Sequence, residues 1–203
     1  MAVSCVETWD AIHAQHGDER EWYVDAEAVC DYCKAELLFV EGDGEADGAP
    51  PKRVWHFGCG TSVLGVLLAE ANCDVLNTDA SRLAIDQMAR ARPEGRWAVD
   101  DARDARGRGP FDLVVDKGAF DSITASAATR GDAARRVVAS IHASLAPGAA
   151  WACFSGFAPH EKDTRLLIES GADWDSVDCD PFGASPFELP DQECGYVYVC
   201  RRR

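Results

Sequence analysis

The sequence predicts an α/β protein with a Rossmann-like, doubly wound and mostly parallel sheet that carries an antiparallel edge strand at its C-terminal end. Two observations lead to this fold class. From Arg53 onward, short apolar segments alternate with helical patterns, which is typical of a parallel sheet with crossover helices. The last two apolar segments are instead joined by residues 180–193, which contain three prolines and no helical pattern. That connection predicts an antiparallel pair at the sheet edge.

The elements follow in order along one predicted domain, residues 1–203. Residues 1–40 form a helical segment too short to fold alone, residues 41–52 an acidic Gly- and Pro-rich surface loop, and residues 53–203 the Rossmann-like core. Strands are expected at 54–57, 74–78, 96–99, 111–115, 150–154, 174–179 and 195–200. Helices are expected up to Ala71, from an N-cap at Ser81 to Ala91, over 132–145, and ending near Gly171.

Composition narrows the possible partners. No apolar run approaches the roughly 20 residues needed to cross a bilayer, and the first ten residues carry no targeting pattern. We therefore expect a cytoplasmic protein without a membrane partner. The net charge of −15, from 20 basic and 35 acidic residues, repels a phosphate backbone, so we expect no nucleic-acid partner. The same charge would attract a basic protein, or it serves solubility alone.

A glycine-rich turn follows the first strand. Gly58, Cys59 and Gly60 stand between that strand and the next helix, where glycines let the backbone approach a ligand closely. Asp79 ends the second strand about 20 residues later, where an acid accepts hydrogen bonds from ribose hydroxyls. An acid there is also a common helix cap. The loop and the acid together predict a nucleoside-type cofactor.

The spacing within this loop argues against a dinucleotide. Val63 stands where the dinucleotide fingerprint places its third glycine beside the pyrophosphate. A sulfonium cofactor has no pyrophosphate and does not need that approach. Asp101, after the third strand, is positioned to accept from an adenine amino group while the Ala102 N–H donates to a ring nitrogen. Asp101 also reads as a solvated loop acid, because Asp100 and Asp104 crowd the same stretch.

The most specific segment follows the fourth strand. Asp116 lies at the carboxyl end of an apolar strand, where ligands bind in open α/β sheets. Lys117 and Asp121 follow at once. Spaced four residues apart, these two would also suit a simple ion pair in the first turns of a helix.

These segments resemble the eukaryotic protein-lysine methyltransferases of the elongation factor 1A and citrate synthase group, within the seven-β-strand class that uses S-adenosylmethionine. The resemblance rests on the G-C-G-x-S loop (58–62), the D-K-G-x-x-D segment (116–121), and Trp9-Asp10 followed by Glu21-Trp22-Tyr23. It implies S-adenosylmethionine as cofactor, a protein substrate with an accessible lysine (an elongation factor or a metabolic enzyme), and an N-terminal aromatic segment folded over the cofactor. The implied cofactor residues are Trp22, Tyr23, His56, Gly58, Cys59, Gly60, Ser62, Asp79, Ala80, Asp101, Ala102, Asp116 and Lys117.

In the mechanism that this resemblance suggests, Asp116 is the catalytic residue that orients the lysine amine, whose proton must leave before attack. Tyr23 and Phe120 would contact the methylated amine through their rings, and His160, past the fifth strand, would touch substrate. His56 stands where many relatives carry an acid. No metal site is expected. His13, His16, His142 and His160 have no partners at ligand spacing, and most of them are expected at the surface.

Two alternatives remain open at this stage. One is a small-molecule methyltransferase on the same fold, since the compact chain has no added substrate domain. The other is a non-catalytic protein that keeps the fold as a binding scaffold.

Overall fold

The computed structural model describes residues 5–16, 21, 24–39, 50–105, 108–183 and 195–203. Its strands are β1 (Lys52–Phe57), β2 (Cys73–Asp79), β3 (Arg96–Val99), β4 (Phe111–Lys117), β5 (Leu145–Ser155), β6 (Trp174–Pro181) and β7 (Tyr196–Arg202). Its helices are α1 (Cys5–His16), α2 (Ala26–Tyr32), the π-helix η1 (Cys33–Leu38), α3 (Leu64–Glu70), α4 (Arg82–Ala91), α5 (Ala119–Ile123), α6 (Arg130–Ser144) and α7 (Thr164–Glu169). None of these helices is long and apolar enough to cross a membrane.

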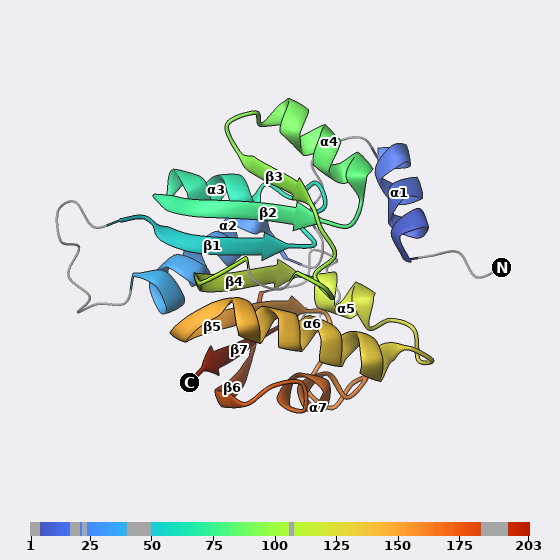
Figure 1. Ribbon diagram of the computed structural model, residues 1–203, viewed down its shortest axis with the longest axis vertical. Helices are drawn as coiled ribbons and strands as arrows, with labels where there is room; N and C mark the ends of the chain where they lie inside the picture. Colours follow the sequence, from blue (N-terminus) through green and yellow to red (C-terminus); the bar gives the residue numbers. More distant parts are fainter. Residues whose placement is uncertain (1–4, 17–20, 22–23, 40–49, 106–107, 184–194) are drawn as a thin grey trace.

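The seven strands form one sheet in the order β3-β2-β1-β4-β5-β7-β6 (Figure 1). Strands β1 to β5 pair in parallel, whereas β7 is antiparallel to both β5 and β6. The predicted fold class is confirmed. The antiparallel strand β7 is inserted one place from the edge, and β6, which it pairs with, forms the edge itself.

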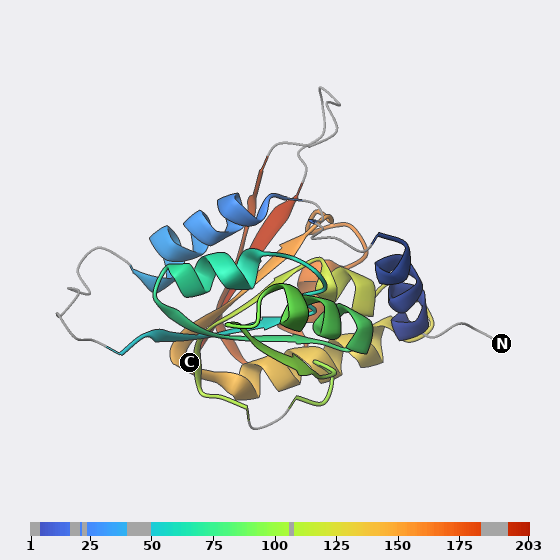
Figure 2. The same ribbon diagram turned by 90° about the horizontal axis from the view of Figure 1, so that it is seen from above.

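Helices lie over both faces of the sheet (Figure 2), and an apolar layer lies between the sheet and the helices on each side. One face packs against α2, η1 and α3 through Val54, Leu113, Val115 and their neighbours. The other packs against α5 and α6 around Trp55 and Trp151, both fully buried. Because side chains alternate along a strand, Leu113 and Val115 of β4 enter the first layer and Val114 enters the second.

Two local features differ from the sequence prediction. Strand β5 begins at Leu145, directly after α6, rather than at Ala150. Its register with β4 shifts between Phe111 and Leu113, so residues 145–149 join the sheet across an irregularity. The short helix α5 was not predicted, because five residues are too few to show a 3.6-residue repeat.

Candidate functional site

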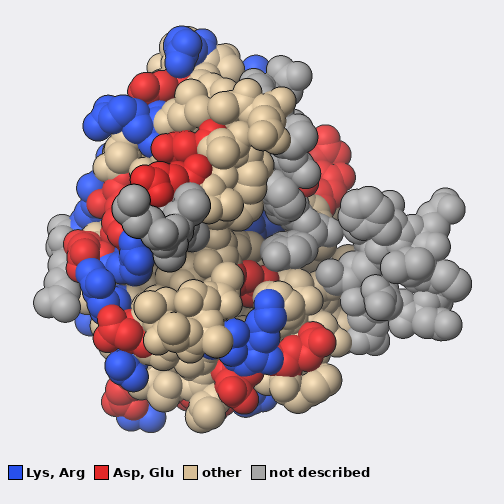
Figure 3. Space-filling view, turned by 90° about the vertical axis from the view of Figure 1, so that its right-hand side faces the viewer, with Lys and Arg blue, Asp and Glu red and all other residues tan. Residues whose placement is uncertain are grey.

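The candidate site lies at the carboxyl edge of the parallel strands, where β1, β2, β4 and β5 end. Crossovers bring these strand ends to one side of the sheet, and ligands bind in that position in open α/β sheets. Figure 3 views the molecule from that side and shows Asp and Glu interspersed with Lys and Arg around a less charged middle.

The glycine loop after β1 has the conformation that its sequence requires. Gly58 and Gly60 have φ values of +57° and +49°, which L-residues rarely adopt. A Cβ on Gly58 would lie only 2.2 Å from the Cβ of Ala119. The Cys59 N–H donates to Thr78 O at 3.0 Å, and the Cys59 side chain is buried. The loop is therefore fixed against both β2 and α5.

Asp79 is joined directly to this loop. One carboxylate oxygen accepts a hydrogen bond from the Gly60 N–H at 2.9 Å, and the other accepts from the Ser81 N–H at 2.7 Å. Burial raises the pKa of Asp79, although both hydrogen bonds and His13 act to lower it. Ala80, between Asp79 and Ser81, is half-buried at the same corner.

Glu21 was not predicted as a site residue, yet its carboxylate contacts three other residues here. It accepts from the Ser62 hydroxyl at 2.9 Å and from the Val63 N–H at 3.0 Å. It also pairs with the Lys117 ammonium at 2.7 Å. In the sequence, Glu21 stands out only because it directly precedes the aromatic pair 22–23, since its partners lie at least 41 positions away.

Lys117 lies inside the protein, with only 2% of its side chain exposed. Burial lowers the pKa of Lys117, while the Glu21 carboxylate acts to raise it. The pair connects the end of β4 to the glycine loop through one carboxylate. The simple helical pair between Lys117 and Asp121 that the spacing allowed is not seen, since Lys117 pairs with Glu21 instead.

Helix α1 crosses the same edge. Its Trp9 indole N–H donates to the Ser122 hydroxyl at 2.5 Å, and its Asp10 accepts from the Ser81 hydroxyl at 2.5 Å. A Cβ on Gly60 would lie 3.3 Å from the Cε1 atom of His13. His13 is buried, which makes it an exception among the histidines, most of which are expected at the surface. The resemblance includes Trp9-Asp10, but their partners Ser122 and Ser81 could not be derived from the sequence.

Asp116 lies deep in the core rather than in the cleft. It is fully buried, and its two oxygens accept from the Phe120 N–H and from the Trp151 indole N–H, both at 3.0 Å. Burial raises the pKa of Asp116 to about 7, although those two hydrogen bonds act to lower it. With 0% of its surface exposed, Asp116 offers nothing that an acceptor could contact, and this weighs against the predicted catalytic role.

His56 is buried within β1. Its Nδ1 lies 3.0 Å from the Asn77 Oδ1, which makes that ring nitrogen the donor. Burial lowers the pKa of His56 to about 4, although Asn77 acts to raise it, while nearby Lys117 lowers it further. A neutral imidazole therefore stands where an acid was expected.

The third strand end carries Asp101 and Ala102. Asp101 is half-buried, and both its carboxylate oxygens accept from the Arg103 guanidinium, at 2.5–3.0 Å. Burial acts to raise the pKa of Asp101, but Arg103 outweighs it and the pKa is lowered. Ala102 is buried. The structure thus places this acid at the predicted edge with a cation already bound to it.

Of the other predicted site residues, Phe120 lies in the core and His160 lies at the surface. Phe120 is 1% exposed and packs edge-on against Trp151, with ring centroids 5.4 Å apart, so its ring belongs to the core. His160 is exposed after β5. Trp22 and Tyr23 lie outside the described residues.

Asp121 links α5 to the segment after β5. Its carboxylate accepts from the Ser155 hydroxyl at 2.7 Å and from the Gly156 N–H at 2.9 Å. Burial raises the pKa of Asp121, while those two donors and Lys162 act to lower it. The second acid of the D-K-G-x-x-D segment therefore fixes the loop that follows β5.

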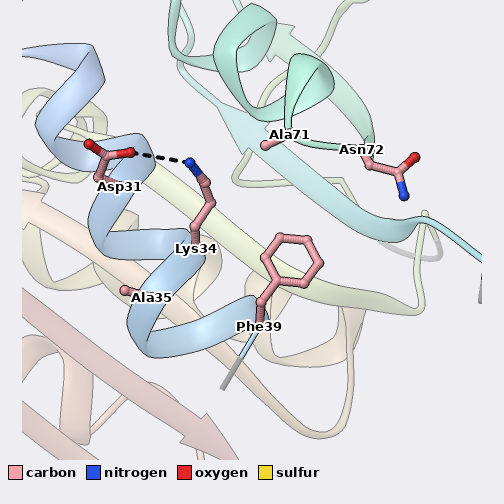
Figure 4. A pocket seen from close by; sticks show the side chains of 6 residues that line it. All are labelled: Asp31, Lys34, Ala35, Phe39, Ala71 and Asn72. Atoms are coloured by element: carbon pink, nitrogen blue, oxygen red, sulfur yellow. Dashed lines mark hydrogen bonds and ion pairs between the residues drawn. The ribbon is translucent and has the colours of Figure 1, made fainter. Parts of the chain in front are cut away.

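A separate hollow lies away from this edge (Figure 4). It is lined by Asp31, Lys34, Ala35, Phe39, Ala71 and Asn72. Ala71 and Asn72 directly precede the amino end of β2, so the hollow opens at the opposite edge of the sheet from Asp79.

Comparisons with known proteins identify the architecture. No family model matches the chain, and no curated protein matches it. Solved structures do. A TehB-like SAM-dependent methyltransferase from Corynebacterium glutamicum aligns with a TM-score of 0.60 at 20% identity, over 95% of this chain and 93% of its own. A structure described by the conversion of a disulfide bond into a thioacetal group during echinomycin biosynthesis aligns with a TM-score of 0.66 at 22% identity, over 97% of this chain and 92% of its own.

Magnesium protoporphyrin IX methyltransferase from Synechocystis, solved with bound SAM, gives a TM-score of 0.60 at 15% identity, over the whole of this chain and 86% of its own. Identities this low establish the fold alone. The chain therefore has the seven-stranded, Rossmann-like fold of the SAM-dependent methyltransferases.

Proposed function

We propose that this protein is an S-adenosylmethionine-dependent methyltransferase. The observation that supports this proposal is a hydrogen bond between the glycine loop and the end of β2. The Gly60 N–H donates to the Asp79 carboxylate at 2.9 Å. It lies at the carboxyl edge of a sheet with the methyltransferase fold. A loop that a ligand can approach closely, beside a partly buried acid, suits a ribose, whose hydroxyls donate to the carboxylate.

The residues present fit the cofactor at its adenosyl end. Each Asp79 oxygen accepts one backbone N–H and keeps a second lone pair for a ribose hydroxyl. The Ala102 N–H and the Asp101 carboxylate would hold the adenine, with Arg103 competing for that carboxylate. Bound here, S-adenosylmethionine would supply a methyl group on a sulfonium centre.

At the methionine end, the protein supplies position and charge. His56 is neutral over the physiological range because its pKa is about 4, so it cannot replace the attraction of an acid for an ammonium group. Glu21 holds Ser62, Val63 and Lys117 in one cluster. We infer that this cluster orients the glycine loop around the methionine moiety, since proximity supplies much of the rate in a displacement reaction.

We propose a lysine side chain of a protein as the acceptor. This rests on the resemblance of residues 116–121 to protein-lysine methyltransferases and on the net charge of −15, which attracts basic segments. Asp116 then acts from the core: by holding the Phe120 N–H and the Trp151 indole it fixes the start of α5, a positioning role rather than contact with the amine.

A small-molecule acceptor is the second candidate. It is favoured by the solved structures of similar fold, one of which is a magnesium protoporphyrin IX methyltransferase and another of which acts in echinomycin biosynthesis.

Calorimetry with S-adenosylmethionine and S-adenosylhomocysteine tests the proposal, with Asp79→Asn as the binding-deficient variant and Asp74→Asn, on the same strand, as control. Micromolar binding that Asp79→Asn weakens supports a cofactor site, and absence of binding refutes it. Incubation with methyl-labelled cofactor and a cell lysate then separates the acceptors. A discrete labelled protein band that Asp79→Asn abolishes identifies a protein acceptor, whereas label confined to small molecules refutes the lysine assignment.

A further inference from the structure

The loop after β5 brings an ammonium group onto an aromatic ring. The Lys162 Nζ atom lies 3.4 Å from the centroid of the Phe157 ring. A cation at this distance over a ring face is attracted by the ring quadrupole. Lys162 itself is an exposed residue, so burial does not force its ammonium into that place.

A buried carboxylate accompanies the ring. Asp121 is 5% exposed, and Lys162 is the cation whose charge acts on it. Ser155 joins the two parts, because its hydroxyl donates to Asp121 at 2.7 Å and accepts from the Phe157 N–H at 3.0 Å. The Phe157 carbonyl in turn accepts from the Tyr198 hydroxyl at 2.9 Å. A single chain of hydrogen bonds thus joins the Asp121 carboxylate to the backbone of Phe157.

This pair lies beside the D-K-G turn. The Gly118 N–H donates to Phe154 O at 2.8 Å, which ties the end of β4 to the end of β5. Asp121 comes from the first turns of α5, directly after that turn. An amine bound between Asp121 and Phe157 would therefore lie at the same edge of the sheet as the glycine loop.

The backbone of the loop after β5 reverses direction at Lys162. Lys162 and Asp163 have φ values of +49° and +55°, a region that residues other than glycine rarely occupy. Glu161 holds the preceding turn, where its carboxylate accepts from the Ala158 N–H at 2.9 Å. Two consecutive left-handed residues turn the chain back, so that Lys162 reaches a ring five positions earlier.

We propose that Phe157 and Asp121 form the binding site for the amino group of a primary alkylamine acceptor, and that the ammonium of the chain's own Lys162 occupies the ring face of this site in the structure. The proposal rests on the methyltransferase function proposed above, and it deepens that function by placing the acceptor. A ring face and a carboxylate are the two groups that recognise an alkylammonium ion, the ring through its quadrupole and the carboxylate through its charge.

A titration that uses no cofactor tests this site. The chain is labelled with fluorophenylalanine at its eight Phe positions, and the Phe157 signal is assigned by its loss in Phe157→Leu. Nα-acetyl-lysine amide is the probe, and Nα-acetyl-norleucine amide, which has no amino group, is the matched control. Lys162→Met removes the resident ammonium while keeping a flexible side chain.

We expect the lysine probe to shift the Phe157 signal saturably in Lys162→Met, and to bind at least about threefold more weakly to the unchanged chain, because Lys162 competes. The norleucine probe should leave the signal unmoved. Asp121→Asn combined with Lys162→Met should weaken the lysine probe further, and circular dichroism checks that this variant folds. Equal binding to both chains, equal binding of both probes, or no saturable shift in Lys162→Met would each overturn the proposal.

Failure here is distinct from failure of the proposed function. If cofactor binds in calorimetry while the lysine probe does not, the acceptor site is wrong and the methyltransferase stands. If the probe binds while the cofactor does not, the amine site stands and the methyltransferase proposal is refuted.

Discussion

Removing Glu21 should destabilise the protein far more than removing Lys117, although the two form one ion pair. The Lys117 side chain is 2% exposed and that of Glu21 is 28% exposed, with 2.7 Å between the charges. Glu21→Ala leaves a buried ammonium without its partner, and breaking a buried pair in this way costs roughly 3–5 kcal/mol. Because the loss of Glu21 also lets water approach Lys117, we expect the lower end, about 3 kcal/mol.

Lys117→Met keeps the buried volume and removes the charge. Glu21 then retains the Ser62 hydroxyl and the Val63 N–H and stays partly solvated, so this change should cost less than about 1 kcal/mol. The double variant should resemble Lys117→Met, so the coupling energy should equal the loss in Glu21→Ala, about 3 kcal/mol.

Urea unfolding of the four proteins at pH 7.5 measures this cycle. The exposed pair Arg136–Asp104 is the matched control, and its coupling should stay below about 1 kcal/mol. Equal losses in the two single variants, or a coupling no larger than that of the control, would show that Glu21 does not compensate a buried charge.

Three further outcomes are expected. Asp79→Asn should raise the Kd for S-adenosylmethionine by roughly tenfold or more in calorimetry, because a hydrogen bond to a charged group contributes about 1.5–3 kcal/mol; unchanged affinity would remove Asp79 from the site. Asp116 has a folded pKa raised to about 7 from 3.8, so its contribution to stability is present at low pH and is lost as pH rises from about 4 to about 7. Relative to Asp116→Asn, the unchanged chain should therefore lose on the order of 3 kcal/mol across that window in urea unfolding, and parallel pH profiles would contradict this. Gly58→Ala places a Cβ 2.2 Å from that of Ala119 and should cost about 2–4 kcal/mol in thermal unfolding; Gly148→Ala, with φ of +77° and open space, should cost about 1 kcal/mol, and similar losses would refute the packing argument.

Much of the fold could be predicted because its signals are local. Apolar strands such as 111–115 and turn residues such as Gly58 report on their own surroundings, and parallel strands separated by helices have few possible topologies. The insertion of β7 between β5 and β6 could not be derived in this way. It depends on which of two consecutive strands lies beside β5, and an antiparallel pair can be placed with either strand at the edge.

The site was harder to predict, because its decisive contacts join residues far apart in the chain. Glu21 meets Lys117 across 96 positions, and His13 lies against Gly60. A sequence shows that an acid or an imidazole is present, but burial and partners decide what it does. Asp116 shows this most clearly: its place at a strand end suggested catalysis, and its alternation along β4 turns it into the core beside Trp151.

The D-K-G-x-x-D segment is best understood as a junction of three connections. Along β4, successive side chains point to opposite faces, so Asp116 enters the layer around Trp151 while Lys117 turns to Glu21. Gly118, with φ of +83°, then reverses the chain into α5, where Asp121 reaches the loop after β5. The three charges therefore act on three separate parts: the core, the N-terminal segment over the glycine loop, and the proposed acceptor loop. Neutralising Asp116 should change the pH dependence of stability, neutralising Lys117 should change the packing of Glu21 on the glycine loop, and neutralising Asp121 should change amine binding. If the three formed a single catalytic cluster, each substitution would change all three properties.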